Sequence, residues 1–347
     1  MKKNLRNILA LSLGLMTTVA FAQDWNVDSR TRIDMSGDNS KMSTDQRVTV
    51  GTTWGGDAWG IHVSSDVNYT FVNYTLADTN GAGASMNIYE AYASTDLMGY
   101  ASLTAGRQAL NYGSGALMSS NDWAASRTTW DGMKFGLNLD MADITVGYHS
   151  QNGGDADEES TGNMWVNAGG EFSGWKVNVL YMTEQANGES GDAATGIDIS
   201  GELMGAGISA SMNTDYAGGE MNMLGVSYAV NDDMNVVAGY TTYGETGFTM
   251  AGTNMYGSWM ETGGVGYLGA NDENLSIGGT YGMGAFNLGA TMHMITDSED
   301  DTYERDVMEL SLGYSLNDNA GVSLKYATDA TGDDEAKYMW VTLNVGL

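Results

Sequence analysis

The chain has 347 residues, a formal net charge of −30, no cysteine and no proline. Such an acidic chain is not expected to bind nucleic acid, because phosphate contacts need a basic surface, and disulfide bonds are excluded. Hydrophobic residues make up 42% of the chain and aromatic residues 10%, which is more than a disordered acidic chain contains. We therefore expect a folded protein that keeps its acidic groups away from its apolar surfaces.

The first residues have the features of a secretory signal peptide. Three basic residues precede an apolar run at 8–20, and Ala20-Phe21-Ala22 is an A-x-A cleavage signal. We expect residues 1–22 to be removed and residues 23–347 to form one domain. An uncleaved membrane anchor is the alternative, but the apolar run is short for it, and no other stretch predicts a transmembrane helix.

The mature chain repeats one pattern, in which apolar and polar residues alternate over about eighteen short segments. In the first segment, 25–35, odd positions are mostly apolar or small, and even positions carry Asn, Asp and Arg. Successive side chains of a β-strand point to opposite faces, so one face can meet lipid and the other water. The same alternation is clear in segments that begin near residues 47, 59, 175, 286, 308 and 339.

The links between these segments alternate between short and long. Short, turn-like links lie near residues 55–57, 97–99, 140–142, 171–174, 231–232 and 317–319, and long ones at 73–84, 111–126, 152–161, 187–192, 214–219, 244–271, 296–304 and 330–335. This is typical of an up-and-down barrel with periplasmic turns and extracellular loops. We predict an all-β, antiparallel transmembrane β-barrel of about 18 strands, with 16 as the alternative count.

Aromatic residues gather near the predicted strand ends in the outward phase. Amphipathic rings favour the headgroup level, so they predict the aromatic girdles of a membrane barrel. The core of a soluble β-protein is the alternative. The residues are Trp25, Trp54, Trp59, Tyr69, Trp175, Tyr181, Tyr240 and Tyr314.

The opposite phase of the strands carries charges of both signs. The alternation places inward Arg30, Arg32, Arg47, Asp66, Lys134, Lys176, Glu309 and Lys325, together with Asp28 and Asp34. On a lumen wall, mixed charge narrows a pore and selects ions. Charge pairing that braces adjacent strands is an equally good interpretation, and the same residues could do both.

Arg107 breaks the pattern, because strict alternation points it toward lipid at too high a cost. We expect a β-bulge near Gly106 to turn Arg107 inward. The loop that follows either folds into the lumen as a constriction or stays a plain extracellular loop.

These residues resemble a known family. Gly106-Arg107-Gln108, Asn121-Asp122-Trp123, Arg127 and Trp130-Asp131-Gly132 are similar to motifs of the alginate-export family of outer-membrane barrels, and Glu90-Ala91-Tyr92 fits less specifically. The resemblance implies an eighteen-stranded barrel in which Arg107 and Arg127 line the pore; we place Glu90 with them. Alginate exporters resemble basic conduits, so the acidic excess here favours a general or cation-tolerant porin.

Other chemistry has little support. His62, His149 and His293 lie in the inward phase without a nucleophile motif beside them, so an outer-membrane hydrolase is a third-ranked hypothesis. No cofactor is expected, except that acidic loops could hold Ca²⁺ through carboxylates. The Ca²⁺ candidates are Asp155, Asp157, Glu158, Glu159, Asp300 and Asp301.

The sequence therefore predicts a non-enzymatic porin in the outer membrane of a Gram-negative bacterium, through which small hydrophilic solutes or ions diffuse along a charged lumen. The alternative is a structural or surface barrel with an occluded lumen and acidic, cation-bridged loops. Outer-membrane lipid and lipopolysaccharide are the expected surroundings. The resemblance is compatible with monomers and homo-oligomers, with a slight preference for the latter.

Overall fold

The computed structural model describes residues 23–37, 42–71, 84–139, 141–151, 161–186 and 189–347. The predicted signal peptide lies outside the described residues, and so do Asp155, Asp157, Glu158 and Glu159. No helix in the described ranges is long and apolar enough to span a membrane.

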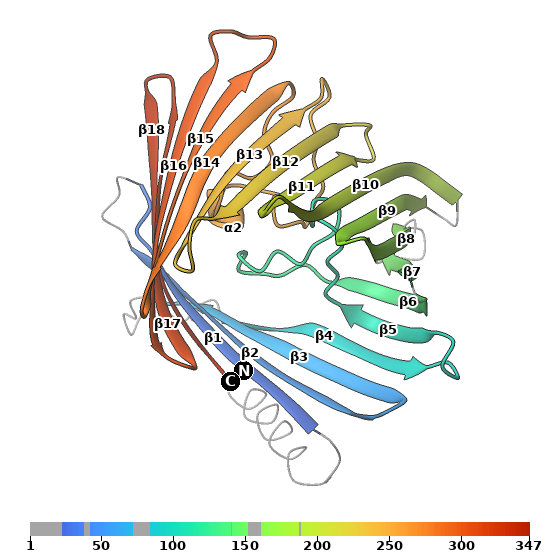
Figure 1. Ribbon diagram of the computed structural model, residues 1–347. Helices are drawn as coiled ribbons and strands as arrows, with labels where there is room; N and C mark the ends of the chain where they lie inside the picture. Colours follow the sequence, from blue (N-terminus) through green and yellow to red (C-terminus); the bar gives the residue numbers. More distant parts are fainter. Residues whose placement is uncertain (1–22, 38–41, 72–83, 140, 152–160, 187–188) are drawn as a thin grey trace.

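The strands form one closed antiparallel barrel. Each strand pairs with its neighbours in the chain, and β1 pairs with both β2 and β18, which closes the sheet (Figure 1). The barrel therefore has 18 strands, which confirms the predicted count over the alternative of 16. The strands are β1 (Gln23–Asp34), β2 (Ser43–Gly56), β3 (Trp59–Thr70), β4 (Ser85–Asp96), β5 (Ser102–Gln108), β6 (Trp130–Leu139), β7 (Ala142–Gln151), β8 (Thr161–Phe172), β9 (Trp175–Ala186), β10 (Glu189–Leu203), β11 (Ala206–Thr214), β12 (Glu220–Ala229), β13 (Met234–Tyr243), β14 (Asp272–Met283), β15 (Phe286–Asp297), β16 (Glu304–Asn317), β17 (Ala320–Thr331) and β18 (Asp334–Gly346).

The two ends of the barrel differ as expected, with two exceptions. One end carries short turns throughout, and we call it the short-turn end; the other is the long-loop end. At the long-loop end, the long links predicted at 187–192 and 330–335 are wrong in length. β9 ends at Ala186 and β10 begins at Glu189, and β17 ends at Thr331 and β18 begins at Asp334, so most of the predicted link residues belong to strands. Strand ends that extend into water have no reason to alternate, so their polar sequence resembles a loop.

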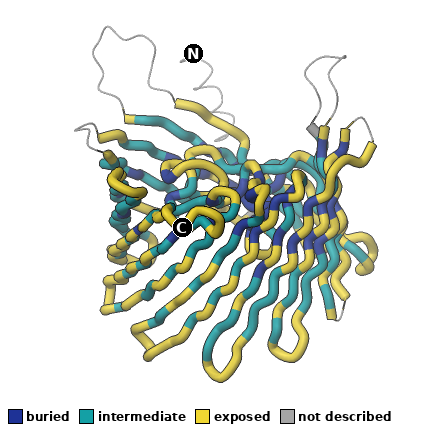
Figure 2. Tube along the Cα trace, turned by 90° about the horizontal axis from the view of Figure 1, so that it is seen from above, coloured by how far each residue is buried: buried dark blue, intermediate teal, exposed yellow. Residues whose placement is uncertain are grey.

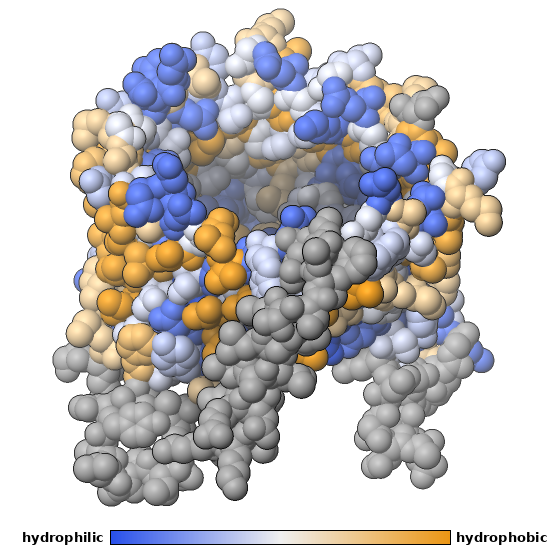
Figure 3. Space-filling view, turned by 90° about the horizontal axis from the view of Figure 1, so that it is seen from below, coloured by the Kyte–Doolittle hydropathy of each residue, from blue (hydrophilic) through white to orange (hydrophobic). Residues whose placement is uncertain are grey.

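The outer face is apolar, as the alternation predicts. Trp25, Trp59, Tyr181, Tyr240 and Tyr314 are 38–49% exposed on it. Figure 3 shows hydrophobic side chains on the outer flanks and hydrophilic ones around the rim of a hollow. Because lipid offers no hydrogen bonds, such a wall needs every strand paired, and barrel closure provides that.

Two long links fold into the barrel instead of standing above it. Figure 1 shows loop 109–129, between β5 and β6, inside the ring of strands, and loop 244–271, between β13 and β14, enters beside it with the short helix α2 (Trp259–Thr262). The infolded alternative for the loop after Arg107 is thus confirmed, and loop 244–271 adds a second infolded segment. That the loops narrow the pore stays a prediction.

The infolded loops create an apolar core inside the barrel. Their buried side chains are Leu110, Ala116, Leu117, Met118, Phe248, Met250, Trp259 and Leu268, and they cluster with inward wall residues Trp165, Leu180, Met182, Ala194, Met221, Tyr243, Ile295, Val307, Ala327 and Trp340. Figure 2 shows the buried positions away from the exposed short turns. Apolar burial of this kind stabilises a fixed loop position.

Candidate functional site

The two infolded loops bind each other through hydrogen bonds between backbone and side-chain groups. The backbone N–H of Asn121 donates to Oδ1 of Asn254 at 2.8 Å, and the N–H of Asn254 donates to Oγ of Ser119 at 2.8 Å. The hydroxyl of Tyr267 donates to the carbonyl of Ala116 at 2.6 Å. Burial raises the pKa of Tyr267, so this hydroxyl stays protonated. The loops therefore act as one unit within the lumen.

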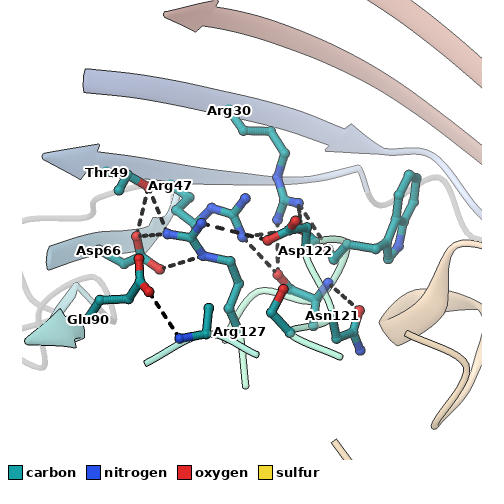
Figure 4. A network of polar contacts seen from close by, with 12 residues as sticks. Arg30, Arg47, Thr49, Asp66, Glu90, Asn121, Asp122 and Arg127 are labelled. Atoms are coloured by element: carbon teal, nitrogen blue, oxygen red, sulfur yellow. Dashed lines mark hydrogen bonds and ion pairs between the residues drawn. The ribbon is translucent and has the colours of Figure 1, made fainter. Parts of the chain in front are cut away.

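A row of arginines on the wall holds loop 109–129. Arg30 donates to the carbonyl oxygens of Asp122 and Trp123 at 2.7 and 3.0 Å, and Arg47 donates to that of Asp122 at 3.2 Å (Figure 4). Arg32 reaches the Trp123 carbonyl at 3.1 Å and lies 4.4 Å from the centre of its ring. The strand register brings these guanidinium groups together, because Arg30 stands opposite Arg47.

Arg127 anchors the other end of this loop in a buried ion pair. Its Nε and Nη2 bind the two carboxylate oxygens of Asp66 at 3.1 and 2.5 Å, and Nη2 also binds Thr49. Tyr89 lies flat against the guanidinium, 3.3 Å from ring centre to Cζ. Burial opposes the charge of Arg127, but the Asp66 hydrogen bond and nearby negative groups raise its pKa overall.

Loop 244–271 is fastened to β17 and β18, which adjoin β1 in the barrel wall. Nε1 of Trp259 donates to Asp329 at 2.7 Å, and Asp329 also binds Arg305 at 2.8 Å. The Trp259 ring stacks on Tyr338 at 5.0 Å. Lys325 donates to the Gly263 carbonyl at the end of α2.

Lys325 also belongs to a charged group on the wall. Its Nζ lies 2.9 Å from Glu309, and Nε2 of His293 lies 3.5 Å from the other oxygen of the same carboxylate. The charges predicted at Glu309 and Lys325 are therefore paired with each other, and they brace the wall under loop 244–271.

Among the described residues, two cavities border loop 109–129, along the same part of the wall. The upper cavity, of about 780 Å³, opens toward the long-loop end, and the lower cavity, of about 570 Å³, toward the short-turn end. The upper cavity is lined by Arg107, Thr128, Thr129, Trp130, Asp131, His149, Ser150, Asn163, Glu184, Tyr216, Thr249, Met250 and Ala251. The lower cavity has Asp143, Glu171, Lys176, Asn178, Asp198, Ser200, Ser209 and Ser211 among its lining residues.

The tip of loop 109–129 touches the wall at the lower cavity. A Cβ on Gly113 would lie 1.8 Å from the Asp198 carboxylate and 3.0 Å from Oδ1 of Asn178, and Gly113 has a φ of +56°. Glycine is required there for both reasons. Next to it, the hydroxyls of Ser114 and Ser211 lie 3.1 Å apart.

The predicted inner-face residues take the expected phase, but they fall into separate groups. Arg30, Arg47, Asp66 and Arg127 form the network of Figure 4, and Arg32 binds the same loop at the Trp123 carbonyl. Glu90 accepts the N–H of Ala109 at 3.0 Å and lies 3.6 Å from His62, so it holds the start of loop 109–129. Lys176 lines the lower cavity, and Lys134 stands opposite Gly147 on the same inward face as His149. Their role in permeation stays a prediction.

Arg107 corrects one prediction. The β4–β5 and β5–β6 ladders pair without a register shift through Gly106, so no bulge exists there. Gly106 instead has a φ of +129°, and a Cβ would lie 2.2 Å from the Ala91 carbonyl. Arg107 stays in the outward phase of β5, opposite Ala91 and Asp131, so the prediction that it turns into the lumen is wrong. It sits where β5 ends, forms two 2.7 Å hydrogen bonds with Asp131, and borders the upper cavity. Its charge is satisfied at the strand end without bending the strand.

Sequence reasoning missed several lining residues. Tyr89 points inward with Glu90 because a β-bulge in β4 shifts the register opposite Ser64 and Ser65. Glu184 and Asp198 lie in the inward phase of β9 and β10, where the alternation is interrupted by small residues. Asp143 and Glu171 stand next to turns, where the phase is hard to assign.

The Ca²⁺ and histidine hypotheses gain no site. Within the described ranges, no group of three or more His, Asp or Glu side chains is placed to hold a metal ion. Asp300 is exposed and its carboxylate accepts from Thr302 at 2.6 Å. A Ca²⁺ role for the acidic loops, the homo-oligomer and the lipopolysaccharide contact remain untested predictions.

Comparison with known proteins defines the family. The model of the Gram-negative porin family matches residues 9–346, whereas no curated protein sequence matches the chain. The fold is similar to that of Pseudomonas aeruginosa OpdK, with a TM-score of 0.72 and 12% identity over 94% of this chain and 100% of that one. P. aeruginosa OccK5 (OpdH) has a TM-score of 0.69 and 10% identity, and Acinetobacter baumannii OccAB4 has a TM-score of 0.68 and 11% identity. Both comparisons cover 94% of this chain and 98% of the other one. The matched family replaces the alginate-export resemblance.

Proposed function

We propose that this channel prefers cations. The chain belongs to the Gram-negative porin family and is an outer-membrane channel for passive diffusion of small hydrophilic solutes. The proposed route follows the β7–β11 wall from the upper cavity, past the tip of loop 109–129, into the lower cavity. By the usual topology of such barrels, the long-loop end is extracellular and the short-turn end periplasmic.

The observation that carries this proposal is the distribution of free charge. The carboxylates of Asp143, Glu171 and Asp198 line the lower cavity, where Lys176 is the one basic residue among the described lining residues. Fixed negative charge in a narrow, water-filled lumen attracts cations and repels anions.

The arginines do not offset this acidic route, because they are engaged elsewhere. Arg30 and Arg47 are directed at carbonyl oxygens of loop 109–129, and Arg127 is bound to Asp66. Asp28, Asp34 and Asp45 occupy the same strands, and Asp45 stands directly opposite Arg32. The arginine wall is thus nearly neutral and shielded by the loop.

The tip of loop 109–129 adds a local argument. Oδ1 of Asp198 and Oδ1 of Asn178 are buried and accept no hydrogen bond from any described residue. The two residues are directly paired across β9 and β10. Buried acceptors without a donor are costly, so water or a passing cation is their expected partner.

The proposed solute charge is opposite to that of the molecule bound in one structural neighbour. A structure of P. aeruginosa OpdK contains vanillate, which is a carboxylate. The identity to that protein is 11%, which supports a shared fold but no shared solute. The acidic lining argues against both vanillate-like anions and a polyanion such as alginate.

The test is the reversal potential of the purified protein in a planar bilayer under a tenfold KCl gradient. We expect the sign of a cation-preferring channel, and D198N should bring the potential closer to zero. D306N is the matched control, because Asp306 is exposed on the opposite face from the buried, inward Val307 and lies outside the route. An anion preference, or an equal response to both variants, would contradict the proposal.

A further inference from the structure

We propose that the upper cavity is a binding site for organic ammonium ions, which it holds before they enter the constriction. The inference rests on the proposed route along β7–β11, since this cavity forms its entrance. The cavity, of about 780 Å³, is large enough for a small organic molecule. Three elements supply its walls.

The first element is a free carboxylate. Glu184 is exposed, on the inward phase of β9, opposite Asn163 of β8. Among the ion pairs between described residues, none includes Glu184. The neighbouring Arg107 is already paired, because its Nε and Nη2 bind the two carboxylate oxygens of Asp131. The cavity therefore carries one unpaired negative charge.

The second element is an aromatic wall in a fixed orientation. The Tyr216 hydroxyl donates to Oδ1 of Asn163 at 2.6 Å, which holds the ring near Glu184. Burial, and then the charge of Glu184, raise the pKa of Tyr216, so the hydroxyl keeps donating. On the other side, the Trp130 ring packs edge-on against His149, with centroids 5.1 Å apart.

The third element is the side formed by the infolded loops. Thr128 and Thr129 of loop 109–129 and Thr249 and Met250 of loop 244–271 complete the lining. A Cβ on Gly252 would lie 3.0 Å from the side chain of Thr128, so the two loops meet at this side. The wall is thus built from parts that also form the constriction, and an occupant would sit above it.

This combination selects the charge class of the ligand. A carboxylate together with aromatic faces attracts ammonium groups, through ion pairing and cation–π interaction. An anion would meet the unpaired Glu184 and find Arg107 already engaged. A neutral solute would gain neither charge interaction, so it should bind more weakly than an ammonium ion of the same shape.

Benzylammonium and benzyl alcohol, which differ in charge and little in shape, test the site. Each is added to the extracellular side of single channels in KCl, and the interruptions of current are counted against concentration. We expect benzylammonium to block with a measurable Kd and benzyl alcohol to block at least tenfold more weakly. E184Q should raise the benzylammonium Kd about tenfold, and Y216L should raise it also, whereas Y216F, which keeps the ring, should change it less.

E304Q is the matched control, because Glu304 is exposed at the same end of the barrel and does not line the cavity. It should leave the benzylammonium Kd unchanged. The inference would be overturned if the two probes blocked the channel equally, or if benzylammonium blocked the E184Q channel with the same Kd as the unmodified one. The reversal potential of the same channels separates the binding site from the proposed function. If the channel prefers cations but E184Q does not change the block by benzylammonium, the binding site alone is contradicted. If the channel prefers anions, the cation route is contradicted.

Discussion

A single buried ion pair fixes the end of loop 109–129, and its removal should be costly. Asp66 is 3% exposed, and both of its carboxylate oxygens bind Arg127. R127A would leave the carboxylate buried without its counter-charge, and breaking such a pair costs about 3–5 kcal/mol. We expect R127A to lower the midpoint of heat-induced loss of β-sheet circular dichroism in detergent.

R107A provides the comparison, because it removes a pair of the same residue types whose side chains are 40% and 51% exposed. An exposed pair contributes about 0–1 kcal/mol, so R107A should shift the midpoint little. D66N/R127L, which removes both charges, should recover part of the loss. If R127A and R107A unfolded at the same temperature, the buried pair would contribute no more than an exposed one.

Residue positions could be predicted from the sequence only as far as the alternation continued. It placed Arg30, Arg47 and Lys176 on the inner face correctly, because their strands alternate without interruption. At Arg107 the alternation also held, because the unshifted register leaves this residue in the outward phase; the bulge expected to turn it inward is absent from the β4–β5–β6 pairing. Which charges would pair was not predictable, since Arg127 and Asp66 are brought together by a loop that crosses the lumen.

Among the elements, loop 244–271 is attached to the wall in part through one tryptophan. Trp259 is 5% exposed, stacks on Tyr338 and donates to Asp329. Truncation of a buried tryptophan to alanine typically costs about 3–5 kcal/mol, and here the loss falls on the contact between loop and wall. W259A should therefore loosen the loop, with a higher single-channel conductance and more current noise.

The control for the loop is W59A, because Trp59 is 49% exposed on the outer face and contacts neither loop. It should leave conductance and noise unchanged. A W259A channel with the conductance and noise of the unmodified protein would show that the hydrogen bonds to loop 109–129 hold loop 244–271 without help from the wall.

The strands were predictable and the course of the loops was not, for a physical reason. A strand in a membrane barrel must alternate, because one face meets lipid and the other water. A loop has no such periodicity, and loop 109–129 could equally have stood in solvent. Its apolar residues Leu110, Leu117 and Met118 were the available signal, since they need cover once the loop is infolded.

The whole molecule combines an apolar outer wall, a lumen occupied partly by its own loops, and an acidic route beside them. Its net charge of −30 is spread over exposed loops as well as the lumen. Both sets of acids attract cations, so the bulk composition alone cannot say which set would govern ion preference. The two sets differ in their distance from a permeating ion, and therefore in how strongly salt screens their effect on it.

Ionic strength should therefore distinguish lumen charge from loop charge. The Debye length is about 10 Å at 0.1 M salt and about 3 Å at 1 M, so the exposed loop acids lose most of their influence at high salt. Carboxylates that line the route stay within a few ångströms of a passing ion. We expect the cation preference, measured as a reversal potential at a fixed KCl ratio, to fall only partly between low and high salt.

Two triple variants remove three charges each from the two sets. D143N/E171Q/D198N neutralises the lower cavity, and E299Q/D300N/D301N neutralises exposed acids of the link between β15 and β16. The lumen variant should lose cation preference at both salt concentrations, because its charges act at short range. The loop variant should lose some preference at low salt and match the unmodified channel at 1 M. The reverse pattern would place the selective charge on the surface, and the β7–β11 wall would then be only a passage.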